Sequence, residues 1–125
     1  MKAQTTEIRL KRTYDPASAD DGYRILVDKL WPRGLSHENF HDDLWEKQLA
    51  PSDGLRHWFH EDPVGRKNEF VKRYEAELQK NPALEPFMEE VKSHPIVTLL
   101  FSSKDRHENN ATVLRSVVLS SLGYK

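Results

Sequence analysis

The segment Ile96–Phe101 is the feature that most constrains the fold of this chain. Its residues, IVTLLF, are apolar apart from one threonine, and they lie between His94-Pro95 and two serines. A run this short, with β-branched residues, favours a buried strand over a helix. A second apolar run at residues 23–30 stops at Trp-Pro-Arg-Gly and is also predicted to be a strand. Roughly 65 residues of mostly helical pattern separate the two runs, so we expect parallel neighbours joined by a crossover.

Weaker patterns complete the predicted fold. The alternation at residues 8–11 indicates a short first strand, which we place beside residues 23–30 as a hairpin with a long loop. The helices are expected at residues 36–48, between Ser52 and Asp62, at 65–79, at 84–92 and from Asp105 onward. The last would begin with a D-x-x-E capping pattern of Asp105 and Glu108. The fold class is therefore α/β, a single domain over residues 1–125 with a small open, mainly parallel sheet of three or four strands flanked by about five helices.

Composition excludes several classes of function. The 125 residues carry 19 Lys and Arg against 20 Asp and Glu, and this balance argues against nucleic acid as a partner. The absence of cysteine excludes disulfides, thiolate nucleophiles and Cys-based metal sites. No apolar run approaches the roughly 20 residues of a membrane span, and the N-terminus lacks a signal peptide. We therefore expect a cytoplasmic protein that does not associate with membranes, and its oligomeric state stays open.

Topology points to a candidate site at the ends of the two main strands. Open parallel sheets bind ligands outside the carboxyl ends of their strands. Polar and aromatic side chains follow both apolar runs. They are Asp28, Trp31 and Arg33 after the first run, and Lys104, Asp105, His107 and Asn110 after the second. In this hypothesis Asp28 or His107 is the general acid or base, and the other five bind the substrate. Arg33 and Lys104 would hold an anion, and Trp31 would pack against its apolar part.

Each of these residues also has a structural interpretation. Asp105 is a good helix N-cap, and Arg33 could form an ion pair with Asp28. His107 shares a helical stripe with Leu114 and would face the sheet. Trp31 could simply cover the core.

No cofactor or metal is expected. The serine-rich loop before the last helix lacks the glycines of a P-loop or of a G-x-G-x-x-G fingerprint, and there is no H-E-x-x-H motif. The pairs His37/His41 and His57/His60 have helical spacing but lack a third ligand.

Four segments resemble the YeaO-like family, small bacterial proteins that form a domain of unknown function. They are Tyr14-Asp15, DGYRILVDKLWPRGLS, LAPSDGLRHWF and TLLFSSKDRHENNATVLR, and the most specific motif is D-x-L-W-P-R-G at residues 28–34. The resemblance implies no reaction, cofactor or catalytic residue. The chain reads Phe-His-Glu-Asp-Pro at residues 59–63, where the family pattern would have Gly-His-Asp-Pro after the phenylalanine. His60 is therefore assigned no role.

Two functions remain open at this point. The first is an enzyme or binder for a small anionic metabolite, with its site at the carboxyl ends of the strands, and whether it catalyses a reaction is uncertain. The alternative is a non-catalytic regulatory or protein-interaction module. Its surface would include Trp45, Trp58 and the charged helix at residues 66–77.

Overall fold

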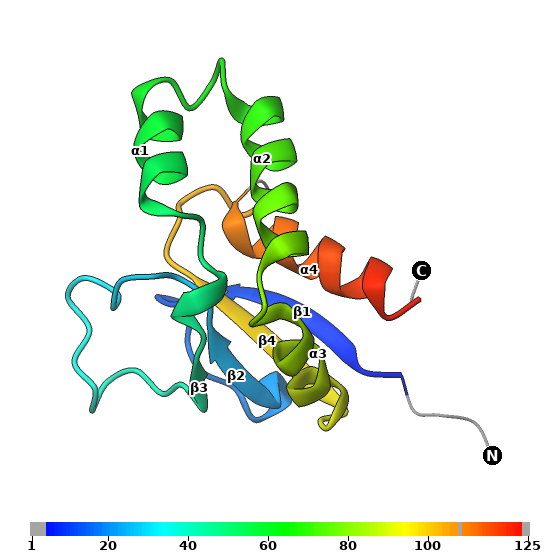
Figure 1. The fold of residues 1–125 in the computed structure, drawn as a ribbon. Coiled ribbons are helices and arrows are strands. Elements are labelled where there is room, and N and C mark those ends of the chain that lie inside the picture. Colours follow the sequence, from blue (N-terminus) through cyan, green and yellow to red (C-terminus); the bar gives the residue numbers. More distant parts are fainter. Residues whose placement is uncertain (1–4, 108, 124–125) are drawn as a thin grey trace.

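The sheet has four strands, all parallel. The computed structural model describes residues 5–107 and 109–123 (Figure 1). The strands are β1 (Glu7–Arg12), β2 (Tyr23–Leu26), β3 (Leu44–Trp45) and β4 (Ile96–Phe101), in the order β1-β4-β2-β3. Strand β4 lies inside the sheet, with a strand on each side, and every residue from Val97 to Phe101 is buried. The predicted hairpin is therefore wrong: β1 pairs with one edge of β4 and β2 with the other.

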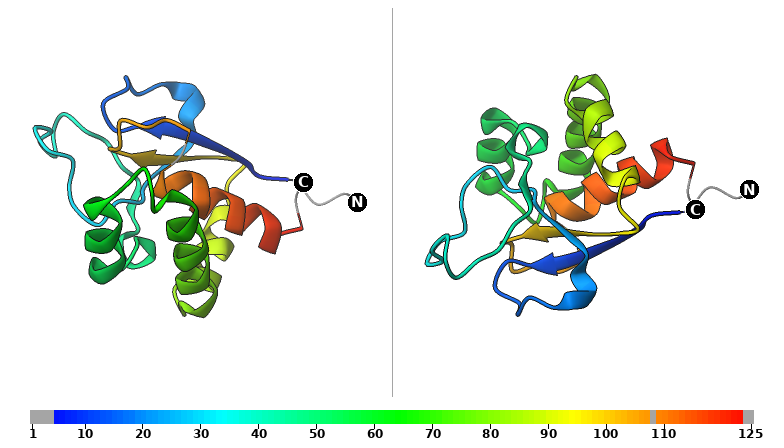
Figure 2. Two further views of the ribbon diagram at one scale, coloured as in Figure 1. Left: turned by 90° about the horizontal axis from the view of Figure 1, so that it is seen from above. Right: turned by 90° about the horizontal axis from the view of Figure 1, so that it is seen from below.

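The four α-helices among the described residues lie on one face of this sheet, as both views in Figure 2 show. They are α1 (Asp53–Glu61), α2 (Lys67–Lys80), α3 (Leu84–Lys92) and α4 (Asn110–Ser121). The predicted stripe on α2 is confirmed, because Phe70, Tyr74 and Leu78 are buried in the main core. The Tyr74 hydroxyl donates a hydrogen bond of 2.6 Å to the carbonyl of Leu49, so its polar atom is satisfied inside that core.

The opposite face of the sheet is covered by loops and the short 3-10 helix η1 (Ala19–Asp21), and by none of the four α-helices. Leu26 and Leu100 point to this side and form a second, smaller core cluster with Phe40. Trp31, Leu35 and Trp45 pack around this cluster. Alternation along the strands thus gives each face its own apolar core.

The helix predicted at residues 36–48 is absent, which lowers the helix number from the expected five to four. The amides of Asn39 and Phe40 both donate to the carbonyl of Ser36 at 3.1 Å, but this turn does not continue as a helix. Two later amides bond to β2 instead. The amide of Asp43 donates to the carbonyl of Arg24 at 2.7 Å, and that of Glu46 donates to Leu26 at 2.8 Å. The Asp43 carboxylate in turn accepts from the amide of Arg24 at 2.9 Å. Pairing along the edge of β2 therefore replaces the helix with the two-residue strand β3.

The last helix begins later than predicted. Asn109, and not Asp105, is its N-cap, and it forms a reciprocal capping box with Thr112. Asp105 accepts from the amide of His107 at 3.0 Å in the preceding loop. Glu108, the other half of the predicted capping pattern, lies outside the described residues.

Within residues 5–107 and 109–123, none of the helices has the length and apolar character needed to cross a membrane.

Candidate functional site

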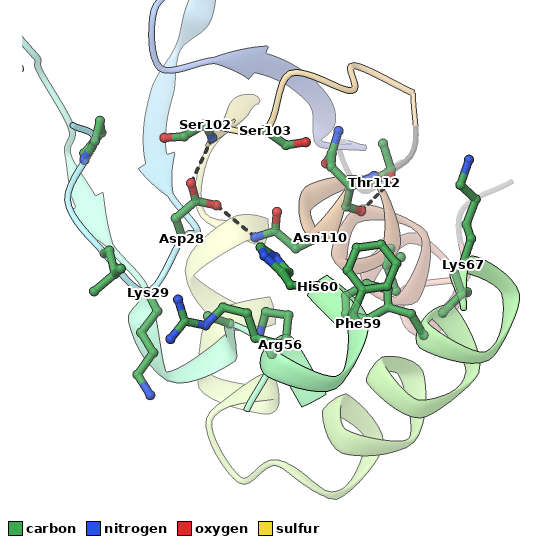
Figure 3. Close-up of a pocket in the computed structure, with 18 of the residues that line it drawn as sticks. Asp28, Lys29, Arg56, Phe59, His60, Lys67, Ser102, Ser103, Asn110 and Thr112 are labelled. Atoms are coloured by element: carbon green, nitrogen blue, oxygen red, sulfur yellow. Dashed lines mark hydrogen bonds between the residues drawn. The ribbon is translucent and has the colours of Figure 1, made fainter. Parts of the chain in front are cut away.

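A cleft of about 680 Å³ lies at the carboxyl ends of β2 and β4, between those ends and α1, α2 and α4 (Figure 3). This size falls in the range of sites that bind small molecules. The lining residues come from the loops after both strands and from the three helices. They include Tyr14, Asp28, Lys29, Leu30, Trp31, Pro32, Arg33, Arg56, Phe59, His60, Lys67, Asn68, Phe70, Val71, Ser102, Ser103, Asn109, Asn110, Thr112 and Val113.

Asp28 connects the strand ends to the start of α4. One carboxylate oxygen accepts from the amide of Ser102 at 2.8 Å, and the other accepts from the side-chain amide of Asn110 at 3.0 Å. Figure 3 shows both bonds along one side of the cleft. The Trp45 indole adds a hydrogen bond of 2.8 Å to the Asp28 carbonyl. Both carboxylate oxygens are therefore engaged by fixed donors, which suits a positioning role.

The lining carries an excess of positive charge. Lys29, Arg33, Arg56 and Lys67 contribute cations, whereas Asp28 is the one carboxylate among the described lining residues. The whole chain, by contrast, has a net charge of -1. Positive charge is therefore concentrated in the lining of this cleft, a distribution that attracts anions.

Arg56 has a buried nitrogen that lacks a partner. Its Nε is enclosed without a hydrogen bond among the described residues. One terminal nitrogen lies 3.4 Å from the Asp53 carboxylate, which is a long contact. An unpaired buried donor is costly, and native structures rarely leave one without a function or a ligand.

One wall of the cleft is apolar. Phe59 on α1 and Phe70 on α2 have ring centroids 4.4 Å apart, and Val71 and Val113 lie beside them in the lining. The arrangement can accommodate an acidic group near Arg56 and an apolar group against these rings.

The loop after β4 is fixed to the end of β1. The Arg12 guanidinium donates to the carbonyls of Ser102 and Ser103 at 2.9 and 2.8 Å. Asp15 forms a two-bond ion pair with Arg106, with both distances 2.8 Å. The hydrogen bonds from Arg106 lower the pKa of Asp15 from its ordinary value to about 2. This rim of the cleft is therefore held by several polar contacts.

Tyr14 fixes the other rim. Its hydroxyl donates to the Arg33 carbonyl at 2.8 Å, which anchors the Trp-Pro-Arg-Gly turn. Gly34 in that turn has φ of 83°, a conformation that favours glycine.

The structure brings together four of the seven residues that the sequence indicated. Asp28, Trp31, Arg33 and Asn110 all line the cleft. The Trp31 ring also stacks on His37, with centroids 3.8 Å apart, and packs against Phe40, so it both covers the second core and borders the cleft.

Lys104, Asp105 and His107 lie outside the lining, exposed in the loop before α4. The prediction that His107 faces the sheet is wrong, because α4 begins at Asn110 and helical spacing does not extend back to residue 107.

Sequence reasoning missed the wall formed by α1 and α2. Arg56 and His60 are four residues apart on α1 and both line the cleft, as does Lys67 at the start of α2. The spacing of Arg56 and His60 was a usable signal, since residues at i and i+4 share a helix face. Nothing local indicated that this face packs over the strand ends.

The described ranges contain no group of three or more His, Asp or Glu side chains arranged to hold a metal ion. The pair His37/His41 loses its helical spacing because residues 36–48 form no helix. His37 stacks on Trp31, and His41 lies 2.8 Å from Asp43.

Comparison with known proteins gives a family and several relatives. A family described as "Inactive DUF488-N3 subclade" matches residues 7–125. The uncharacterized protein YeaO of Escherichia coli K12 is 41% identical over 107 residues, 86% of this chain and 92% of that protein. Uncharacterized proteins of Mycobacterium tuberculosis H37Rv and Mycobacterium bovis are each 34% identical over 113 residues, 90% of this chain and 94% of theirs. No solved structure matches the chain significantly.

Proposed function

This chain belongs to the DUF488-N3 subclade that is described as inactive, and from that premise we propose that it binds a small organic anion in the cleft without converting it. The observation that carries the proposal is the charge of the lining, four cations with one carboxylate. That carboxylate accepts hydrogen bonds from the Ser102 amide and the Asn110 side chain.

The residues have distinct parts in this proposal. The acidic group would be bound by Arg56, Arg33 and Lys29, since a guanidinium pairs with a carboxylate or phosphate through two parallel bonds and an ammonium adds a further donor. Phe59, Phe70 and Trp31 would contact the apolar part of the ligand. Asp28 would position the rim and would not exchange protons, because its two oxygens hold β4 and α4 in place.

The shape of the cleft favours an organic anion over an inorganic one. A volume of about 680 Å³ is several times what a bare phosphate or sulfate needs, and one wall is apolar. A ligand with both an acidic and an apolar part would use the whole cleft.

The protein-interaction alternative finds less support, because both tryptophans assigned to it are partly buried and pack against other side chains of the chain. The Trp58 ring has the guanidinium groups of Arg66 and Arg73 over it, at 4.7 and 4.2 Å. The Trp45 ring contacts Trp31, with Lys47 placed 4.2 Å from its centre.

A thermal-shift screen tests the proposal with organic phosphates, carboxylates and their neutral analogues. A ligand at a hundred times its dissociation constant adds about 2.7 kcal/mol, which raises the melting temperature of a domain of this size by roughly 8 to 15 °C. We expect at least one anion to stabilise the wild type and its neutral analogue to leave it unchanged.

Two variants locate the site. Arg56→Ala and Arg33→Ala should reduce the shift, whereas Lys104→Ala, which removes a cation outside the cleft, should keep it. Loss of the shift only in Lys104→Ala would place the anion at the loop before α4 and contradict the cleft.

A further inference from the structure

Asp53 occupies a position between two cations of the cleft. The same carboxylate oxygen lies 2.6 Å from the Lys29 ammonium and 3.4 Å from the Arg56 guanidinium. Lys29 and Arg56 line the cleft, and Asp53 at the first residue of α1 does not. Two of the four lining cations therefore already share an anionic partner that belongs to the chain.

We propose that the acidic group of the ligand replaces the Asp53 carboxylate between Lys29 and Arg56, so that Asp53 acts as a built-in competitor that limits affinity. This inference rests on the proposed anion-binding function. It assigns the ligand a terminal carboxylate or phosphate, because such a group presents oxygens to both cations as Asp53 does.

The contact with Asp53 is of a kind that a ligand can displace. The side chains of Asp53 and Lys29 are 60% and 42% exposed, and exposed ion pairs contribute little to stability. The hydrogen bond from Lys29 lowers the pKa of Asp53, so the competitor is fully charged at neutral pH.

The start of α1 does not depend on Asp53. The Ser52 hydroxyl caps the helix by accepting from the amide of Leu55 at 3.2 Å. The amide of Ser52 also donates to Glu77 on α2 at 3.0 Å. Asp53 can therefore turn away, or be replaced by asparagine, while the helix keeps its cap.

Isothermal calorimetry with naphthyl phosphate and naphthoate tests the inference, with naphthol as the neutral comparison. Asp53→Asn should bind either anion about two- to fivefold more tightly than the wild type, the range expected for removal of one exposed ion-pair competitor. Glu85→Gln on α3 changes the net charge equally, away from the cleft, and should leave the affinity unchanged. In a Lys29→Met background the gain from Asp53→Asn should shrink.

The outcomes separate this inference from the function beneath it. If the wild type binds the anions and Asp53→Asn binds them equally or more weakly, Asp53 is no competitor and the inference is overturned while the function stands. An equal gain in Glu85→Gln would also overturn it, since the effect would then be one of net charge. If neither anion binds, or naphthol binds as well as the anions do, the anion-binding function itself fails.

Discussion

Asp21 and Arg24 form a buried ion pair on the sheet face opposite the helices. Each residue is only 5% exposed. Arg24 also donates to the carbonyl of His41 at 2.8 Å, and Asp21 accepts from Lys11 at 2.9 Å and from the amide of Ser18 at 3.0 Å. Burial alone would raise the pKa of Asp21, but these hydrogen bonds outweigh it and lower the pKa. The pair holds the segment before β2 against the sheet.

Asp21→Asn should destabilise the protein by about 3 to 5 kcal/mol, because it leaves a buried guanidinium without its counter-charge. Urea unfolding followed by circular dichroism measures the change. The neighbouring Asp20→Asn removes an exposed acid and should stay within about 0.5 kcal/mol of the wild type. Equal effects of the two variants would contradict a special role for the buried pair.

Asp28→Asn tests whether Asp28 positions the rim or acts on the ligand. Asparagine offers one acceptor where Asp28 supplies two, so its amide group would face either the Ser102 amide or Asn110. We expect a loss of about 1 to 3 kcal/mol in the free energy of unfolding. An unchanged stability with lost ligand binding would instead indicate direct contact between Asp28 and the ligand.

At the scale of elements, two variants test which residue is the N-cap of α4, the observed Asn109 or the predicted Asp105. Asn109→Ala should cost about 1 kcal/mol, since it removes the acceptor of the Thr112 amide at 3.0 Å. Asp105→Ala should cost less, because its carboxylate accepts from the amide of His107 in the loop before the helix. Urea unfolding of both variants measures the two losses of stability. A larger loss in Asp105→Ala than in Asn109→Ala would indicate that Asp105 is the N-cap.

Local sequence patterns predicted the helices and strands whose ends are set by neighbouring proline and serine residues. Leu84–Lys92 and Ile96–Phe101 are confirmed to the residue, between prolines and small polar residues. The stripe of α2 is confirmed as well. In such segments the periodicity and the breakers fix the structure before any long-range contact forms.

The failures occur where partners distant in sequence decide the structure. Residues 36–48 carry a helical pattern, yet the amides of Asp43 and Glu46 bond to the backbone of β2. The strand at residues 7–12 has no local signal for its partner, and it pairs with the buried apolar strand β4 instead of with β2.

The candidate site divides in the same way. The strand-end rule led us to expect Asp28, Arg33 and Asn110 close together, and all three line the same cleft. Arg56 and Lys67 come from α1 and α2, and their place beside the strand ends depends on how those helices pack over the sheet. The sequence therefore indicated the lining residues that follow the strands, whereas those on α1 and α2 became evident only in the tertiary structure.

At the scale of the whole molecule, the ion pair of Asp15 and Arg106 couples stability to pH. The folded-state pKa of Asp15 is about 2, below its ordinary value of 3.8. A lowered carboxyl pKa stabilises the folded state at pH above the ordinary value. This contribution is lost as the pH falls from about 4 to about 2.

Asp15→Asn should therefore flatten the decline of stability between about pH 4 and pH 2, measured by urea unfolding at a series of pH values. In Arg106→Gln the pKa of Asp15 should rise toward its ordinary value of about 4. NMR titration of the Asp15 carboxyl group measures this change. If the pKa of Asp15 stays at about 2 in that variant, the lowered pKa is due to the hydrogen bond from the Arg12 amide and not to Arg106.

The strand order also determines when the sheet can assemble. Strands β1 and β2 lie within the first 26 residues, and both pair with β4, which ends at Phe101. During translation, β1 and β2 are made about 70 residues before their shared partner, so their pairing edges stay unpaired until β4 has been synthesised. The sheet can form only after Phe101 has been translated. Contacts of such long sequence separation slow this step.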